Sequence, residues 1–108
     1  MQTQTNNTHK KAVDPYLKQK ILSATPEQLT SIAFDIAISA CHRNDTAKVN
    51  RVISELISTL DFEQGEVALR FFEIYRYVRQ CVYRGQTDTA VELLKELRES
   101  WNKAMNIV

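Results

Sequence analysis

The sequence predicts an all-α protein, an antiparallel up-and-down four-helix bundle with an additional short N-terminal helix. Apolar residues recur every three to four positions in five separate segments, which is the spacing of one face of an α-helix. The chain has only two glycines and two prolines, and all four stand where these segments begin or end. The links between the segments are short, so successive helices are expected to run antiparallel.

The N-terminal part of the chain is predicted to be a flexible tail followed by a short helix. Residues 1–13 are polar, rich in Thr, Asn and Gln, and have no helical periodicity. Residues 14–108 are predicted to form the bundle domain, which is large enough for a modest core without disulfides or metals. Asp14 is expected to cap a helix that starts at Pro15 and covers 15–23. A helix this short is marginal in water, so we expect it to pack on the rest of the chain.

The next helix, expected over 26–43, has more apolar surface than one neighbouring helix usually covers. It opens with a capping box between Thr25 and Gln28, and Pro26 takes the first helical position. One face carries only apolar residues, namely Leu29, Ile32, Ala33, Ile36, Ala37 and Ala40. A second, offset face carries Phe34, Ile38 and Cys41. This second face is either buried within the domain or kept for a helix of another chain.

Three further helices are expected over 47–60, 66–84 and 88–105. The helix over 66–84 has a predicted core face made of Val67, Phe71, Ile74, Tyr75, Val78, Cys81 and Val82. Leu69, Phe72 and Tyr83 project off that face, close to Arg76. Gly85 is expected to end the helix over 66–84, and Thr87 is expected to cap the last helix. Trp101 falls at the centre of the apolar face of that last helix and is expected to be a core anchor.

The residues show no constellation for catalysis, for a cofactor or for a metal. The only histidines are His9 in the tail and His42 on a polar stripe, which is poor material for a metal site or a general base. The net charge is +1, and the arginines of 66–84 scatter around the helix, so no nucleic-acid partner is expected. No apolar run approaches the length of a membrane-spanning helix, so no membrane insertion is expected. Cys41 and Cys81 lie in apolar patterns, which favours free buried thiols and a cytoplasmic location.

Five short segments in a fixed order carry a family resemblance. They are Tyr16 followed by SATPEQL at 23–29, then AFDIAI at 33–38, ELISTLDFEQG at 55–65, IYRYV at 74–78 and LKELRESW at 94–101. Together they resemble the flagellar export chaperone family FliS, the cytoplasmic chaperones of flagellin. The resemblance covers about residues 16–101.

This resemblance implies a non-enzymatic function. Members of the family bind the disordered C-terminal segment of flagellin, which folds into helices along an apolar surface groove of the chaperone. This blocks premature polymerisation, and the complex is delivered to the gate of the flagellar type III export apparatus. The N-terminal segment of such chaperones can lie over the groove and yield to the client. The resemblance implies such a role for the apolar side of the short N-terminal helix. The other partner-binding residues are expected from the uncovered apolar faces, and the full set is Tyr16, Leu17, Ile21, Leu22, Phe34, Ile38, Leu69, Phe72 and Tyr83.

Two alternatives of other classes stay open on the sequence. One is a structural or regulatory bundle that self-associates through the same apolar faces, as in a homodimer, or a divergent paralogue with another client. The other is a nucleic-acid-binding bundle, which would show strongly salt-dependent binding. A monomer that takes up a flagellin peptide would favour the chaperone over a stable oligomer that ignores it.

Overall fold

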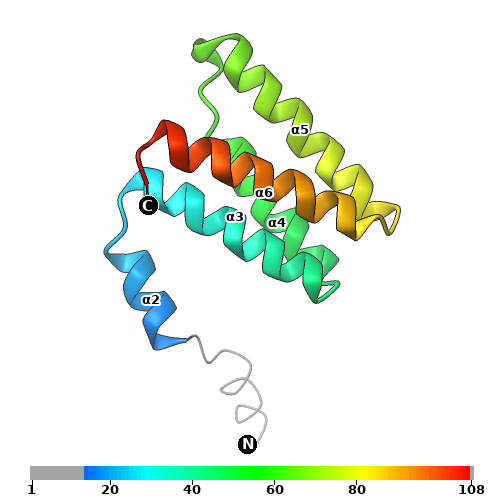
Figure 1. Ribbon diagram of the computed structural model, residues 1–108, viewed down its shortest axis with the longest axis horizontal. Helices are drawn as coiled ribbons and strands as arrows, with labels where there is room; N and C mark the ends of the chain where they lie inside the picture. The colour runs from blue at the N-terminus through cyan, green and yellow to red at the C-terminus, as the bar shows by residue number, and fades with distance from the viewer. Residues whose placement is uncertain (1–13, 108) are drawn as a thin grey trace, which may run out of the picture.

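The computed structural model of the protein describes residues 14–107, which form five α-helices, one short 3-10 helix and no strand (Figure 1). The helices are α2 (Pro15–Leu22), α3 (Pro26–His42), α4 (Thr46–Ser58), α5 (Glu66–Tyr83) and α6 (Thr87–Ala104), and the 3-10 helix η1 (Phe62–Gln64) joins α4 to α5. The predicted all-α fold is confirmed. The tail predicted over 1–13 lies outside the described residues.

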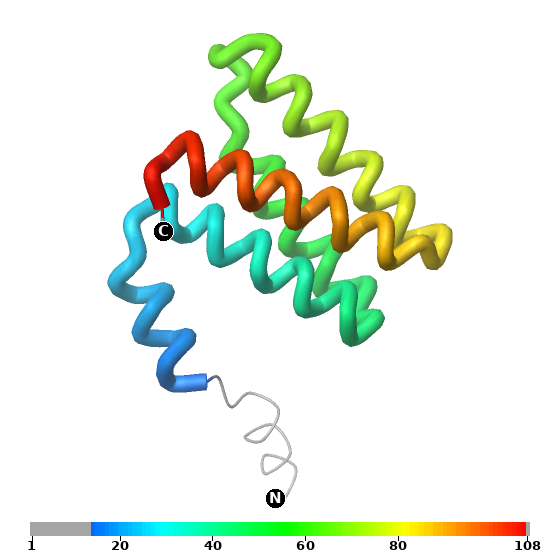
Figure 2. Tube along the Cα trace, in the orientation of Figure 1, coloured from blue at the N-terminus to red at the C-terminus, as the bar shows by residue number. Residues whose placement is uncertain are grey.

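The four long helices form a ring around one core. Helix α3 packs against α4 and α6, and α5 packs against the same two helices from the other side. The trace reverses direction at each link, so neighbouring helices are antiparallel (Figure 2). The largest fully buried side chains come from all four helices and are Tyr75, Phe34, Ile53, Leu56 and Leu94. The contacts of α3 are more extensive than those of α5, so α3 is the more enclosed of the two.

The starts of the first two helices are capped as predicted. The Thr25 hydroxyl accepts a hydrogen bond from the Gln28 amide at 3.1 Å, and the Gln28 side-chain oxygen accepts one from the Thr25 amide at 2.9 Å. Asp14 accepts from the Tyr16 amide at 2.9 Å ahead of Pro15. The prediction that Thr87 caps α6 is wrong, because Thr87 is already the first helical residue and its predecessor makes no side-chain cap bond.

Two of the links turn through residues in the left-handed region. Asn44 has φ 56° between α3 and α4, and Gly85 has φ 77° between α5 and α6. Glycine adopts such a backbone without a steric cost, and asparagine is among the side chains that tolerate it best. These tight turns bring consecutive helices alongside each other and produce the up-and-down order.

Helix α2 lies apart from the ring. It extends away from the start of α3 and stays beside the bundle rather than on it (Figures 1 and 2). None of its residues is buried, and its contacts with the other helices are at most sparse. The prediction that this helix packs on the rest of the chain is wrong in this conformation, and Tyr16, Ile21 and Leu22 are left exposed.

Candidate partner-binding surface

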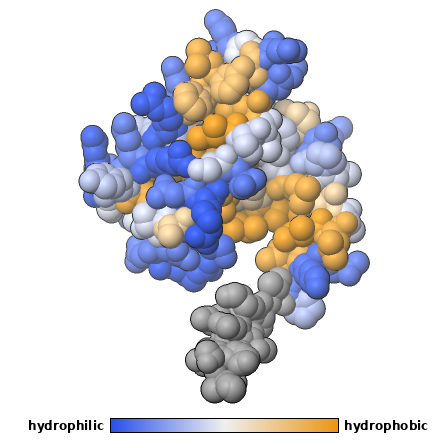
Figure 3. Space-filling view, turned by 180° about the vertical axis from the view of Figure 1, so that it is seen from behind, coloured by the Kyte–Doolittle hydropathy of each residue, from blue (hydrophilic) through white to orange (hydrophobic). Residues whose placement is uncertain are grey.

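Two exposed apolar regions stand out on the surface. Seen from behind, hydrophobic side chains gather at the top of the molecule, over η1 and the start of α5, and again at the lower right, over α2 (Figure 3). The large apolar side chains that are exposed include Phe62, Val67 and Leu69 in the first region and Tyr16, Ile21 and Leu22 in the second. Single exposed apolar residues are ordinary, but gathered ones mark interaction surfaces.

The first region continues along one side of α5 as a line of five residues. We call this line the α5 stripe, which consists of Leu69, Phe72, Arg76, Arg79 and Tyr83. Leu69 is 49% exposed and Tyr83 is 89% exposed, while Phe72 is partly covered. The three apolar members are those predicted to project off the core face, and the structure confirms that they do.

Aromatic contacts organise the start of the α5 stripe. The ring of Phe62, from η1, meets the Phe72 ring edge-on, with 5.9 Å between the ring centroids. The Arg76 guanidinium carbon lies 5.9 Å from the centroid of the same Phe72 ring, on the side of the next turn. Edge-to-face rings and a cation over an aromatic ring are favourable arrangements. Phe72 therefore contacts both a second aromatic ring and a positive charge, with part of its surface open.

Arg79 ties the α5 stripe to α4. Its guanidinium donates a hydrogen bond to the backbone oxygen of Asn50 at 3.0 Å and another to the hydroxyl of Ser54. Both acceptors are neutral, so the arginine keeps its net charge on this side of the bundle. The α5 stripe therefore runs along the edge that α5 shares with α4.

The second exposed region is the apolar side of α2. Tyr16 is 73% exposed and Leu22 is 72% exposed. Ile21 is 37% exposed, and Leu17 is half-buried. Since α2 has no neighbour that covers it, these side chains are open to another chain or to a different position of α2 on the bundle.

The remaining two predicted binding residues do not lie on the surface. Phe34 is fully buried and Ile38 is 7% exposed, and both belong to the core of the bundle together with Cys41. The expectation that they line an open groove is therefore wrong in this conformation. The reason is that α3 has two close neighbours, α4 and α6, so its second apolar face is needed inside the domain.

Sequence reasoning also missed part of the surface. Val67 was expected in the core but is 63% exposed, and Ala68 takes the buried position beside it. Phe62 is 53% exposed and was not singled out, although its ring contacts Phe72 at the start of the α5 stripe. The available signal was an aromatic residue in a largely polar link, LDFEQG, where the helical spacing of apolar residues is interrupted.

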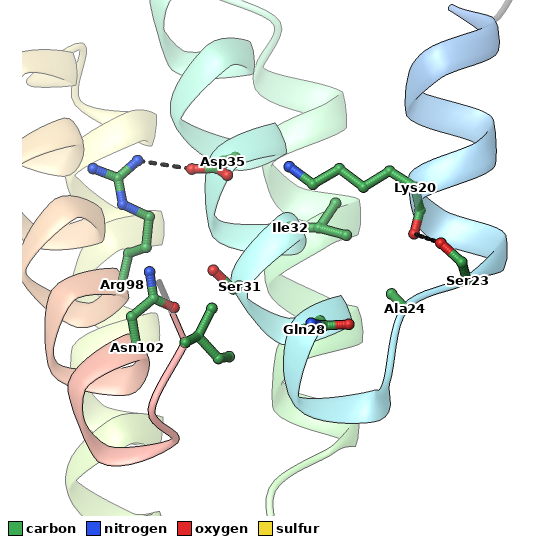
Figure 4. A pocket seen from close by; sticks show the side chains of 10 residues that line it. Lys20, Ser23, Ala24, Gln28, Ser31, Ile32, Asp35, Arg98 and Asn102 are labelled. Carbon is green, nitrogen blue, oxygen red and sulfur yellow. Dashed lines mark hydrogen bonds and ion pairs between the residues drawn. The ribbon is translucent and has the colours of Figure 1, made fainter.

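A polar hollow of about 470 Å³ lies between α2, α3, α6 and the end of the chain. At its edge the Arg98 guanidinium of α6 forms an ion pair with Asp35 of α3, at 2.7 Å (Figure 4). Lys20 reaches in from α2, and Ser31 and Asn102 face each other across the gap between α3 and α6 (Figure 4). The side-chain oxygen of Asn102 is buried and has no hydrogen-bond partner among the described residues.

Trp101 lies at the boundary between the end of α6 and the start of α3. Its ring packs against the core, as predicted, and its indole nitrogen donates to the backbone oxygen of Glu27 at 2.9 Å. This bond joins the end of α6 to the first turn of α3. Together with the Asp35–Arg98 pair it makes the boundary between α3 and α6 a polar, hydrogen-bonded seam.

Burial raises the pKa of two side chains in the core. Desolvation raises the pKa of the Cys41 thiol and that of the Tyr75 hydroxyl, since the charged forms lose their hydration in the core. Both cysteines are buried free thiols. Among residues 14–107 no group of three or more His, Cys, Asp or Glu side chains could hold a metal ion. No helix in the same range is long and apolar enough to cross a membrane.

Comparison with known proteins identifies the family of the chain. Residues 8–108 match the family model described as flagellar protein FliS. No curated protein and no solved structure shows significant similarity to the chain. The matched range covers nearly the whole chain and includes both exposed apolar regions. The chain therefore belongs to the FliS family of flagellar proteins.

Proposed function

We propose that this protein is a cytoplasmic flagellin export chaperone that binds the disordered C-terminal segment of flagellin. It prevents premature polymerisation of the flagellin and delivers it to the gate of the flagellar type III export apparatus. Membership in the FliS family supports the general role of a flagellar export chaperone. The protein contributes a binding surface rather than a catalytic centre.

The observation that carries the proposal is the open apolar side of α5. Leu69, Phe72 and Tyr83 stand on one line, and Phe62 adds a fourth apolar side chain at its start. Leaving a large apolar side chain in water forgoes about 1.5–3 kcal/mol, so a line of them is a favourable site for an amphipathic helix. A client segment that folds on binding must gain enough apolar contact to offset the entropy lost on ordering.

The exposed side of α2 is the second part of the proposed surface. Tyr16, Ile21 and Leu22 are uncovered on a helix that has little contact with the bundle. Such a helix can move toward a bound segment at little energetic cost. We assign Tyr16, Leu17, Ile21 and Leu22 to contacts with the client, alongside those of α5.

Calorimetric titration tests the proposal. The probe is a peptide spanning the C-terminal segment of flagellin from the same organism, titrated into the full chain. We expect 1:1 binding with a negative heat-capacity change, because apolar surface is buried. Phe72→Asp should weaken binding strongly, since it places a desolvated carboxylate in the apolar contact.

A matched pair of tyrosine variants controls this experiment. Tyr83 and Tyr77 are both exposed on α5, but only Tyr83 belongs to the α5 stripe. Tyr83→Asp should weaken binding, whereas Tyr77→Asp should leave it near the wild-type value. Equal effects of the two variants, in folded proteins, would mean that the client does not use this side of α5. A wild-type chain that ignores the peptide and forms a stable oligomer would support the self-associating bundle instead.

A further inference from the structure

The α5 stripe has the spacing of a coiled-coil seam. Its positions, 69, 72, 76, 79 and 83, follow each other at intervals of three, four, three and four residues. This alternation keeps one side of a helix facing a partner helix that crosses at a small angle. The buried residues Tyr75 and Val78 belong to a different side of α5, so the seam is additional to the packing inside the bundle. From Leu69 to Tyr83 it spans about 21 Å of helix axis.

The ends and the centre of this seam differ in chemistry. Leu69 and Phe72 make one end apolar and Tyr83 makes the other end aromatic, while the two central positions are Arg76 and Arg79. Arg79 bonds neutral groups of α4. Arg76 lies over the Phe72 ring. Neither arginine forms an ion pair within residues 14–107, where the only pair is Asp35–Arg98.

This charge pattern decides against a second copy of the chain as the occupant. If two α5 stripes met, the arginines at their centres would face each other, whether the helices ran parallel or antiparallel. Like charges placed opposite each other in an interface disfavour that partner. A partner with a carboxylate at the same level would instead pair with Arg76, while its apolar residues covered the two ends.

We infer that the α5 stripe takes one amphipathic helix of the client that carries an acidic residue at its centre. Arg76 stands seven positions from Leu69 and seven from Tyr83. A nearly parallel or antiparallel partner helix would therefore carry apolar residues about two turns to either side of its carboxylate. The inference rests on the proposed function and adds a rule for which segment of the client lies here.

Neutralisation of Arg76 tests this rule. In calorimetric titrations with the flagellin C-terminal peptide, Arg76→Gln should raise the Kd at least fivefold and reduce its dependence on salt. The matched control is Arg70→Gln, which removes the same charge from a different side of the same helix and should leave the Kd within twofold. Circular dichroism and thermal unfolding of each variant show whether the fold is kept.

Charge exchange makes the assignment specific. The acidic residue flanked by apolar residues seven positions away is replaced by lysine in the peptide, which should weaken binding to the wild-type chain. Arg76→Glu should recover binding of that altered peptide and lose binding of the original one. If Arg76→Gln binds the original peptide as the wild type does, the acidic-centre rule is overturned while the chaperone function stands. If the wild-type chain binds no flagellin peptide, both the rule and the proposed function are rejected.

Discussion

The second apolar face of α3 and the α5 stripe arise from the same kind of sequence pattern but have different surroundings. Each contains large apolar residues that lie beside the first apolar face recognised in the sequence of its helix. On α3, Phe34 is fully buried and Ile38 is 7% exposed, whereas on α5 Leu69 is 49% exposed and Tyr83 is 89% exposed. The comparison shows that an extra apolar face predicts a contact without deciding whether the contact lies inside or outside the chain.

The difference follows from what lies beside each face. Ala37 and Ala40 of α3 are fully buried, and Ala33 packs against the core. Small side chains allow helices to approach closely, so α4 and α6 close over α3 on both sides. On the stripe side of α5 the side chains include the bulky Phe72 and Arg76, and α5 is joined to α4 through η1 rather than a tight turn. Its second face therefore stays at the edge of the bundle.

The largest expected effect separates the two phenylalanines. Phe34→Ala should lower the free energy of unfolding by about 3–5 kcal/mol, because it removes a fully buried ring and leaves a cavity. Phe72→Ala should cost about 1 kcal/mol, because its ring is partly exposed and contacts Phe62, which is itself exposed. Urea denaturation followed by circular dichroism measures both values. The order should reverse for binding of the flagellin peptide, where Phe72→Ala is the damaging change.

Equal losses of stability in these two variants would contradict the comparison. They would mean that Phe72 is enclosed in solution and that the α5 stripe is part of the core. A Phe34→Ala chain that keeps its stability would show instead that the second face of α3 is open.

The sequence predicted the helices well because their signals are local. The capping box at Thr25 and Gln28, the proline starts and the glycine at position 85 act within one turn of the chain, and each appears where expected. The exposed side of α5 was also predictable, since the spacing of Leu69, Phe72 and Tyr83 sets them apart from the residues that fill the core.

What the sequence could not decide depended on packing between distant segments. Whether Phe34 is covered depends on how closely α6 approaches α3, and these helices are separated by more than 40 residues of chain. Whether α2 docks depends on weak contacts that leave no periodic signal of their own. Val67 shares a side of α5 with Phe71 and Ile74, which pack on the core. It is exposed because it lies in the first turn, near the end where α5 projects beyond its neighbours (Figure 1).

A smaller effect is expected at the polar seam between α3 and α6. Trp101→Phe removes the hydrogen bond to the Glu27 backbone oxygen and should cost about 1–2 kcal/mol, with part of that loss due to reduced packing. Asp35→Asn breaks an ion pair whose side chains are 29% and 49% exposed, so it should cost at most about 0.5 kcal/mol. Thermal unfolding of both variants at low and high salt measures the difference. A larger loss for Asp35→Asn than for Trp101→Phe would show that the ion pair, rather than the tryptophan, holds this seam.

Thiol reactivity compares the second face of α3 with the α5 stripe at the level of single side chains. Cys41 lies on the second face of α3 and is 2% exposed, and burial raises the pKa of its thiol. Because only the thiolate reacts, native Cys41 should be alkylated far more slowly than an exposed thiol near neutral pH.

In a Cys41→Ala, Cys81→Ala background, Leu69→Cys places a thiol on the α5 stripe and serves as the exposed reference. We expect the introduced thiol to react at the rate of a free cysteine and Cys41 to react only as fast as the protein opens. Mass spectrometry of timed samples measures both rates, and similar values would mean that the second face of α3 opens as readily as the α5 stripe is exposed. Addition of the flagellin peptide should then slow alkylation of the introduced thiol, because Leu69 lies in the proposed contact with the client.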